Sequence, residues 1–109
     1  MNVAQVQKEL DLKILTMPSP QKEIIGGYVG DLLSWVMGRV NEGDAWITIM
    51  SNINIVAVAS LADVSCIIIS EGVNLDDNIT ETATSKGINI LSTELPSYEI
   101  ALKLGGLIK

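Results

Sequence analysis

Three glycines followed by an aspartate are the residues of this sequence that most resemble a ligand-binding loop. Gly26, Gly27 and Gly30 precede Asp31 at the expected start of a helix. Backbone N–H groups in such a loop can hold a phosphate at a helix N-terminus. The order is not G-x-G-x-x-G, however, and Asp31 places a negative charge where the phosphate would lie. The spacing therefore favours a tight turn between a strand and a helix, with a ligand loop as the alternative.

The other residues with reactive side chains are few and scattered. Asp31, Asp44 and Asp63 fall near the expected ends of elements, where they could form an acid–base or metal cluster if the fold brought them together. Capping of turns and helices explains the same positions, and the sequence favours it. Cys66 lies in an expected central strand, which predicts a buried, unreactive thiol. The chain has no histidine, and no nucleophile, base and orienting group can be assigned together. We therefore expect no enzyme activity, metal or cofactor.

Trp35 is expected on the outside of its helix. The apolar residues of that helix form one stripe, and Trp35 falls outside it, four residues before Arg39. Such a pair can stack the guanidinium on the indole or contact a second subunit. Tryptophan and arginine are enriched at the energetic centres of protein interfaces. The pair predicts a homo-oligomer interface, with a dimer favoured, and packing within the chain as the alternative.

Composition predicts one folded domain covering residues 1–109. Of these residues 48% are hydrophobic and 18% charged, which suits a buried core and excludes disorder. The net charge of −6 argues against a nucleic-acid partner, because phosphate binding relies on clustered Lys and Arg. No apolar run approaches the roughly 20 residues that span a bilayer, so no membrane partner is expected. A single cysteine fits a reducing compartment, and we expect the cytoplasm.

Helical and strand patterns alternate along the chain. Helices are expected over 2–10 with Asn2 as the cap, over 31–40 with Asp31 as the cap, from Asn52 or Asn54, from Asn74 to a stop at Gly87, and from Pro96. Strands are expected over 12–16, 24–25, 45–50, 64–70 and 88–91. The apolar run after Asn52 could equally be a strand. The pattern predicts a single α/β domain with a mixed, mostly parallel sheet of about five strands and flanking helices.

Two parts of the sequence resemble one known family. Residues 64–73 followed by a helix and then residues 86–93 are similar to the end of the DRTGG domain and of the related N-terminal domain of HPr kinase/phosphorylase. Residues 25–37 together with 43–48 are similar to the small stand-alone bacterial proteins of that group. The resemblance covers about residues 12 to 105, and it implies a fold like that of the HPr kinase N-terminal domain.

The resemblance implies regulation rather than catalysis. The P-loop of HPr kinase lies in a different domain, and this sequence has no G-x-x-x-x-G-K-[ST]. In regulated pyrophosphatases, DRTGG domains occur beside CBS domains and serve assembly and regulation. Stand-alone members are also similar to proteins encoded near iron-only hydrogenases and signalling kinases, which implies a protein partner in such a system.

One segment departs from the family pattern. The pentapeptide that names the family would fall on residues 50–54, where Ser51 and Asn52 replace the Asp-Arg pair. If that loop binds an anion in relatives, the missing arginine removes the charge that would hold it here.

Two functions remain. The first is a non-catalytic regulatory or assembly module that acts through self-association and protein partners. The alternative is a sensor of a small ligand such as a nucleotide, bound by two loops that follow expected strands, where open α/β sheets place ligands. The residues of those loops are Gly26, Gly27, Gly30, Asp31, Thr48, Ser51, Asn52 and Asn54.

Overall fold

One five-stranded sheet organises the chain in a computed structural model that describes residues 1–108. The strand order is β1-β5-β4-β3-β2, in which β2 to β5 run parallel and β1 runs antiparallel to β5. The strands are β1 (Lys13–Thr16), β2 (Gly26–Val29), β3 (Asp44–Thr48), β4 (Cys66–Ile69) and β5 (Ile90–Ser92). The predicted mixed, mostly parallel sheet is confirmed.

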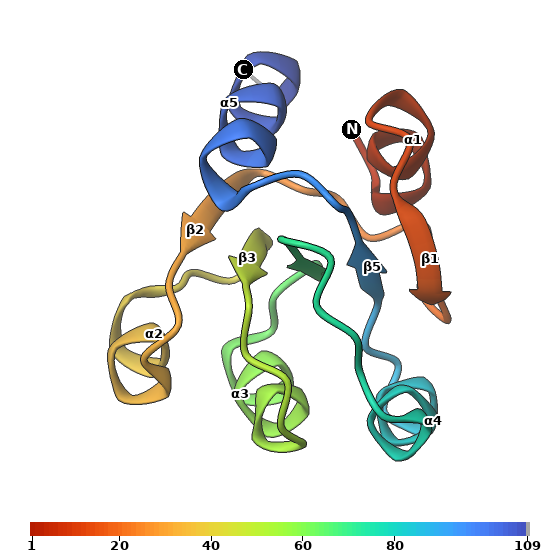
Figure 1. Ribbon diagram of the computed structural model, residues 1–109, viewed down its shortest axis with the longest axis vertical. Helices are drawn as coiled ribbons and strands as arrows, with labels where there is room; N and C mark the ends of the chain where they lie inside the picture. The colour runs from red at the N-terminus through yellow and green to blue at the C-terminus, as the bar shows by residue number, and fades with distance from the viewer. Residues whose placement is uncertain (109) are drawn as a thin grey trace.

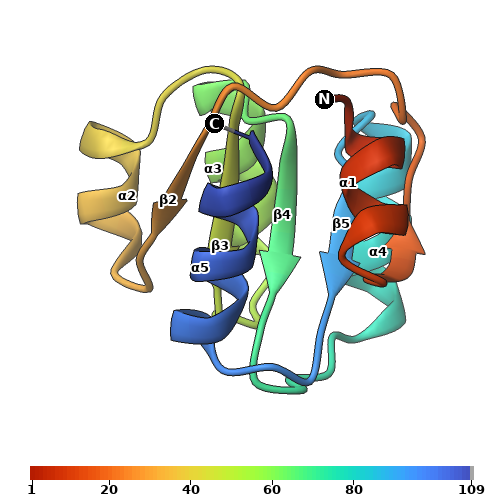
Figure 2. The same ribbon diagram turned by 90° about the horizontal axis from the view of Figure 1, so that it is seen from above.

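Helices cover both faces of this sheet. They are α1 (Val3–Glu9), α2 (Leu33–Arg39), α3 (Asn54–Ala62), α4 (Asp77–Ser85) and α5 (Ser97–Ile108). Figure 1 shows α2, α3 and α4 on one face and α1 and α5 on the other, and Figure 2 shows the same layers from above. No helix within residues 1–108 is long and apolar enough to cross a membrane.

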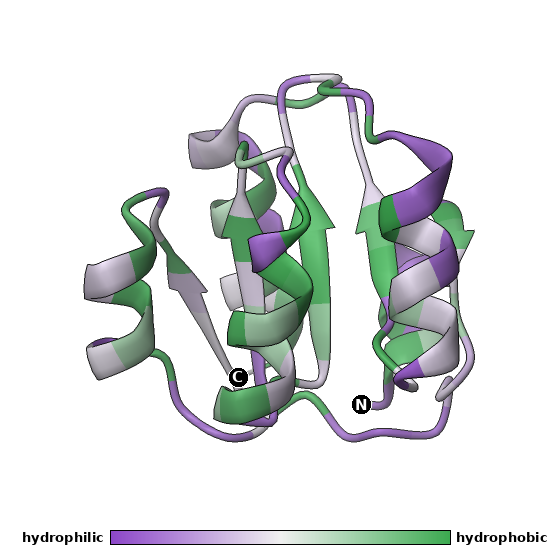
Figure 3. Cartoon of the chain, turned by 90° about the horizontal axis from the view of Figure 1, so that it is seen from below, coloured by the Kyte–Doolittle hydropathy of each residue, from purple (hydrophilic) through white to green (hydrophobic). Residues whose placement is uncertain are grey.

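The central strands explain the two halves of the core. β3 and β4 are buried along their whole length, as the apolar run at 66–69 predicts for a strand covered on both faces. Successive side chains of a strand point to opposite faces, so Trp46 and Ile67 face α2 to α4 while Ile47 and Ile68 face α1 and α5. In Figure 3 the apolar colour is strongest on the central arrows of the sheet, and the helices carry bands of both colours.

Several helix ends follow the sequence signals. The Asn2 side chain accepts from Gln5 N at 2.9 Å while the Gln5 side chain accepts from Asn2 N, a complete capping box. Gly87 follows α4 with φ +73°, the left-handed conformation in which glycine ends a helix most easily. The ambiguous run after Asn52 is helix α3, but its N-cap position is Ile53 rather than the predicted Asn52 or Asn54. The Asn52 side chain still accepts from Asn54 N at 2.8 Å.

Three other boundary predictions were wrong. The second strand is not residues 24–25 but β2, which includes two of the glycines. Asp31 does not cap α2, because Leu32 occupies the N-cap position without a side-chain bond. Asn74 does not begin α4, whose N-cap is Asp76. The two glycines pair with β3, and Asp31 bonds Thr48. Asn74 lies in the connection before α4. All these residue types also favour turns, which is why the sequence misplaced the boundaries.

Candidate functional site

Asp31 joins the two loops that the sequence assigned to a ligand. Its Oδ1 accepts from Thr48 Oγ1 at 2.8 Å and from Ile49 N at 2.9 Å, and Thr48 Oγ1 in turn accepts from Met50 N at 3.2 Å. Thr48 is fully buried at the end of β3. Asp31 and Thr48 therefore lie together, and these bonds fasten the loop after β2 to the loop after β3. Asp31 Oδ1 therefore already accepts two hydrogen bonds from within the chain.

The three glycines do not form one cradle. Gly26 and Gly27 lie within β2, and only Gly30 follows it. A Cβ on Gly26 would lie 2.7 Å from Asp44 Oδ1, and one on Gly30 would lie 2.7 Å from the Tyr28 ring. The Gly30 carbonyl accepts from Trp46 Nε1 at 2.9 Å. Gly26 and Gly27 thus allow close packing along the edge strand β2, and only Gly30 lies in the predicted turn between β2 and α2.

The remaining residues of the predicted ligand loops open helix α3. Ser51, Asn52 and Asn54 are exposed, and Asn52 is bonded to the backbone of Asn54. The positions where the family's Asp-Arg pair would fall therefore form an exposed turn at the start of α3.

The candidate acid cluster does not assemble. Asp44 Oδ2 accepts from Asn41 N at 2.8 Å in the turn before β3. Asp63 has φ +56° at the end of α3 and its carboxylate pairs with Lys22 at 3.1 Å. Across residues 1–108 no group of three or more His, Cys, Asp or Glu residues could hold a metal ion. Asp44 and Asp63 thus act as the turn and cap residues that the sequence favoured, whereas Asp31 bonds the end of β3 instead of capping α2.

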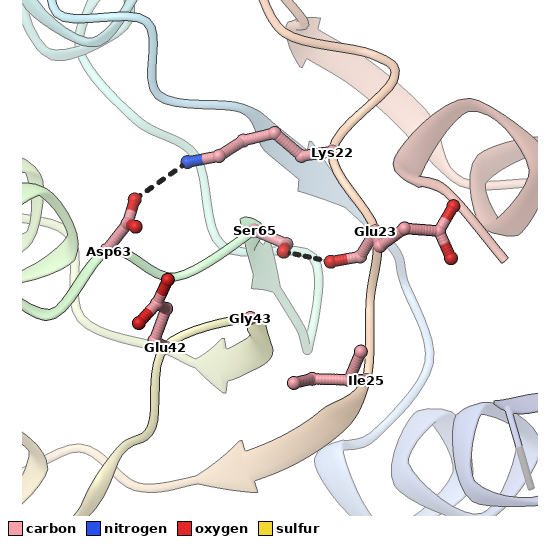
Figure 4. A pocket seen from close by; sticks show the side chains of 7 residues that line it. All are labelled: Lys22, Glu23, Ile25, Glu42, Gly43, Asp63 and Ser65. Carbon is pink, nitrogen blue, oxygen red and sulfur yellow. Dashed lines mark hydrogen bonds and ion pairs between the residues drawn. The ribbon is translucent and has the colours of Figure 1, made fainter.

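A cavity of about 340 Å³ lies at the amino ends of the parallel strands (Figure 4). Lys22 and Asp63 meet on one side of it, and the Ser65 hydroxyl donates to the Glu23 carbonyl on another. The sequence contains no signal for this cavity, because its lining comes from three separate connections, those that precede β2, β3 and β4. Its lysine already has a carboxylate partner, and open α/β sheets bind ligands at the opposite edge. We assign this cavity to the packing of the loops.

Trp35 and Arg39 stack on each other on the surface of α2. The guanidinium carbon lies 4.0 Å from the centroid of the indole, within the range of a cation–π contact. Even so, 56% of Trp35 remains exposed, and Leu32 one turn earlier is exposed as well. We call Leu32, Trp35 and Arg39 the outer α2 face. The stacking that the sequence predicted is confirmed, and it leaves a large apolar surface uncovered.

Cys66 is buried and inert. Desolvation raises the pKa of its thiol from 9.0 to about 12, and the nearby Lys22 charge lowers it by a smaller amount. Native protein is therefore expected not to react with a thiol reagent at pH 8, and denatured protein to react fully. Rapid reaction of the native protein would contradict this assignment.

The raised pKa of Cys66 also predicts a pH dependence of stability. Between pH 9.0 and about 12 the unfolded chain releases a proton that the native thiol retains. The native state then binds more protons, so the free energy of unfolding falls as pH rises, by up to about 1.4 kcal/mol per pH unit. The free energy of unfolding of Cys66→Ala, measured by denaturant titration at several pH values, should therefore fall less steeply than that of wild type between pH 9.0 and about 12.

Comparisons with known proteins agree with this architecture. The family model of the DRTGG domain matches residues 5–107. A solved structure of the CBS and DRTGG domains of the regulatory region of Clostridium perfringens pyrophosphatase, complexed with the activator diadenosine tetraphosphate, superposes with a TM-score of 0.68 at 19% identity. The match covers 94% of this chain and 45% of that one, so the chain spans about half the length of its structural neighbour. No curated protein matches the chain. A family match over nearly the whole sequence, on a fold shared with that regulatory region, shows that the chain belongs to the DRTGG domain family.

Proposed function

We propose that this DRTGG domain is a non-catalytic regulatory module that acts by self-association, as a dimer, through the outer α2 face. The observation that carries the proposal is the exposed Trp35 stacked on Arg39. Large exposed apolar side chains rimmed by polar groups mark interaction surfaces, and Trp and Arg contribute most to such interfaces. A twofold dimer would place this face of one copy against the same face of the other.

Helix α2 gains little stability from its own chain. It has seven residues, its N-cap makes no side-chain bond, and Val36 is its one buried residue. Isolated helices of this length are marginal in water, and most helical stability in proteins comes from packing. A second copy covering the outer α2 face would supply that packing.

The neighbouring edge strand extends the same surface. β2 pairs with β3 on one side and with no strand on the other in the described part of the sheet. Figure 1 places α2 and β2 at the same end of the sheet. Ile25 and Val29, which flank and end β2, are exposed. An unpaired edge with apolar side chains is a ready template for another chain.

Light scattering tests this proposal. Wild-type protein is expected to reach about twice the 11.7 kDa of the chain, and Trp35→Ala to remain at the single-chain mass. Tyr98→Ala is the matched control, because Tyr98 is another exposed aromatic but lies on α5. Circular dichroism would establish that both variants fold. A monomeric wild type, or equal masses for wild type and Trp35→Ala, would contradict the proposal.

The resemblance to proteins linked to signalling kinases and hydrogenases supports a further protein partner, with the cytoplasm as the place of action. A nucleotide sensor is the second candidate, because the structural neighbour was solved with a nucleotide activator. Thermal shift against adenine and guanine nucleotides tests it, since a ligand at 100 times its Kd adds about 2.7 kcal/mol. A shift without a change in mass would favour the sensor over the dimer.

A further inference from the structure

The sheet changes the direction of its connections between β4 and β5. These two strands are parallel neighbours, but α4 follows β4 on one face of the sheet and α5 follows β5 on the other (Figure 1). The helices after β2 and β3 lie on the same face as α4. Open α/β sheets bind ligands outside the carboxyl ends of the strands at such a switch point. This place is not where the sequence put the ligand loops, which follow β2 and β3.

Two cavities lie at this switch point. One of about 270 Å³ is formed with α4 and the loop after β4, and one of about 400 Å³ with the end of α1 and the loop after β5. Lys13, Ser92 and Glu94 line both. We call the first the switch-point cavity. It is lined by polar groups from β1, β5, α4 and both loops, including Lys13, Asp77, Thr80, Ser92 and Glu94.

The two loops that frame the switch-point cavity are hydrogen-bonded to each other. Glu71 N donates to Leu95 O at 2.9 Å and Gly72 N to Thr93 O at 3.0 Å, so the loops continue the pairing of β4 and β5. Gly72 has φ +69°, and a Cβ there would lie 2.6 Å from Glu94 Oε1. The Glu94 carboxylate is therefore placed directly over the Gly72 backbone at the mouth of the cavity. A preformed site of this kind needs little ordering when a ligand binds.

Solvent-exposed charges of both signs line this cavity and form no ion pair within residues 1–108. The ion pairs within residues 1–108 are Met1 with Glu23 and Lys22 with Asp63, so Lys13, Asp77 and Glu94 take part in neither. One ammonium and two carboxylates thus line a space between the strand ends. The excess of carboxylates disfavours a phosphate, and the volume lies below the range typical of drug-sized ligands.

We propose that the switch-point cavity binds a free α-amino acid. Lys13 would pair with the ligand's carboxylate, with the Ser92 hydroxyl as a further donor, while Asp77 and Glu94 would accept from its ammonium group. Such a ligand gives the ammonium of Lys13 a carboxylate and gives the two carboxylates one shared ammonium, so the occupied site keeps one net negative charge. The proposal goes beyond self-association and does not depend on it, since α2 and this cavity lie at different ends of the sheet.

Amide chemical shifts measured by NMR during titration with each of the twenty amino acids would test this site. One amino acid, or a related group of them, is expected to shift the amides of Gly72, Asp77, Ser92 and Glu94 at millimolar concentration. The matching amine without a carboxylate and the matching acid without an amine should each bind at least about tenfold more weakly, because each leaves a charge unpaired. Absence of any shift at these amides, or equal binding of either analogue, would overturn the proposal.

Lys13→Gln and Glu94→Gln test the roles of the charges. Both residues are exposed, so the variants should fold, and each is expected to weaken binding about tenfold, which corresponds to about 1.4 kcal/mol. Lys103→Gln on α5 removes an exposed lysine elsewhere and should bind like wild type. Unchanged binding by Lys13→Gln and Glu94→Gln would overturn the proposal, as would a nucleotide that shifts these amides when no amino acid does. The solution mass of the same samples reports on self-association separately.

Discussion

Trp46→Ala is expected to lower the free energy of unfolding by about 3–5 kcal/mol, the range for deleting a buried aromatic side chain. Trp46 is 0% exposed and packs against the core on the side of α2 to α4. Its Nε1 also holds the Gly30 carbonyl at 2.9 Å, which fixes the end of the edge strand β2. The loss is large beside the 5–15 kcal/mol that stabilises a typical domain. Denaturant titration followed by circular dichroism would measure it.

Two variants separate the causes of that loss. Trp46→Phe keeps most of the buried ring but removes the bond to Gly30, so its stability should lie between wild type and Trp46→Ala. Trp35→Ala removes an exposed indole, and under conditions where the protein is monomeric it should cost less than about 1 kcal/mol. If Trp46→Ala were no more harmful than Trp35→Ala, the assignment of Trp46 to the core would be wrong.

Asn89→Asp is expected to cost about 3–5 kcal/mol at pH 7. Asn89 is 1% exposed, and its Nδ2 donates to the Ser19 carbonyl at 2.7 Å and the Ser65 carbonyl at 2.9 Å. Its Oδ1 accepts from Ser19 N at 2.9 Å. Aspartate has no donor for the two carbonyls, and each unpaired buried group costs about 1–3 kcal/mol. Chemical denaturation of the variant beside wild type would measure the loss.

The defect of Asn89→Asp should diminish in acid. Burial and facing carbonyl oxygens would raise the pKa of the new carboxyl above its unfolded value, so the native state would bind the proton more tightly. Its stability relative to wild type should therefore rise as pH falls through that folded pKa. Asn78→Asp is the control, because Asn78 is exposed in the first turn of α4, where an acidic side chain is favourable. If Asn78→Asp lost as much stability as Asn89→Asp, the hydrogen bonds of Asn89 to Ser19 and Ser65 would not be what stabilises this part of the fold.

Local signals in the sequence account for most of the fold. The apolar run at Cys66–Ile69 predicts the central strand, and Asn2 with Gln5 predicts the start of α1. Gly87 predicts the end of α4 because a left-handed residue was needed there. These features depend on neighbours within four residues, so spacing alone identifies them.

Two of the errors involve contacts between distant parts of the chain. β2 contains two glycines and reads as a loop, yet Gly26 lies against Asp44 and Gly27 against Leu104. Asp31 looks like a helix cap, but its partner is Thr48, 17 residues away. The switch-point cavity joins Lys13 to Glu94, and no pattern in the sequence pairs them. The exposure of Trp35 and its stacking on Arg39 were predicted correctly because helix periodicity is local.

Quenching of tryptophan fluorescence by acrylamide, measured across protein concentration, tests self-association through α2 most directly. Trp46 is fully buried, so a quencher in wild-type protein reports mainly on Trp35, which is 56% exposed. Our account predicts that the quenching constant falls as concentration rises, in step with a doubling of the solution mass. A mass that doubles while Trp35 stays equally accessible would place the interface elsewhere. A mass and a quenching constant that both stay unchanged would contradict self-association itself.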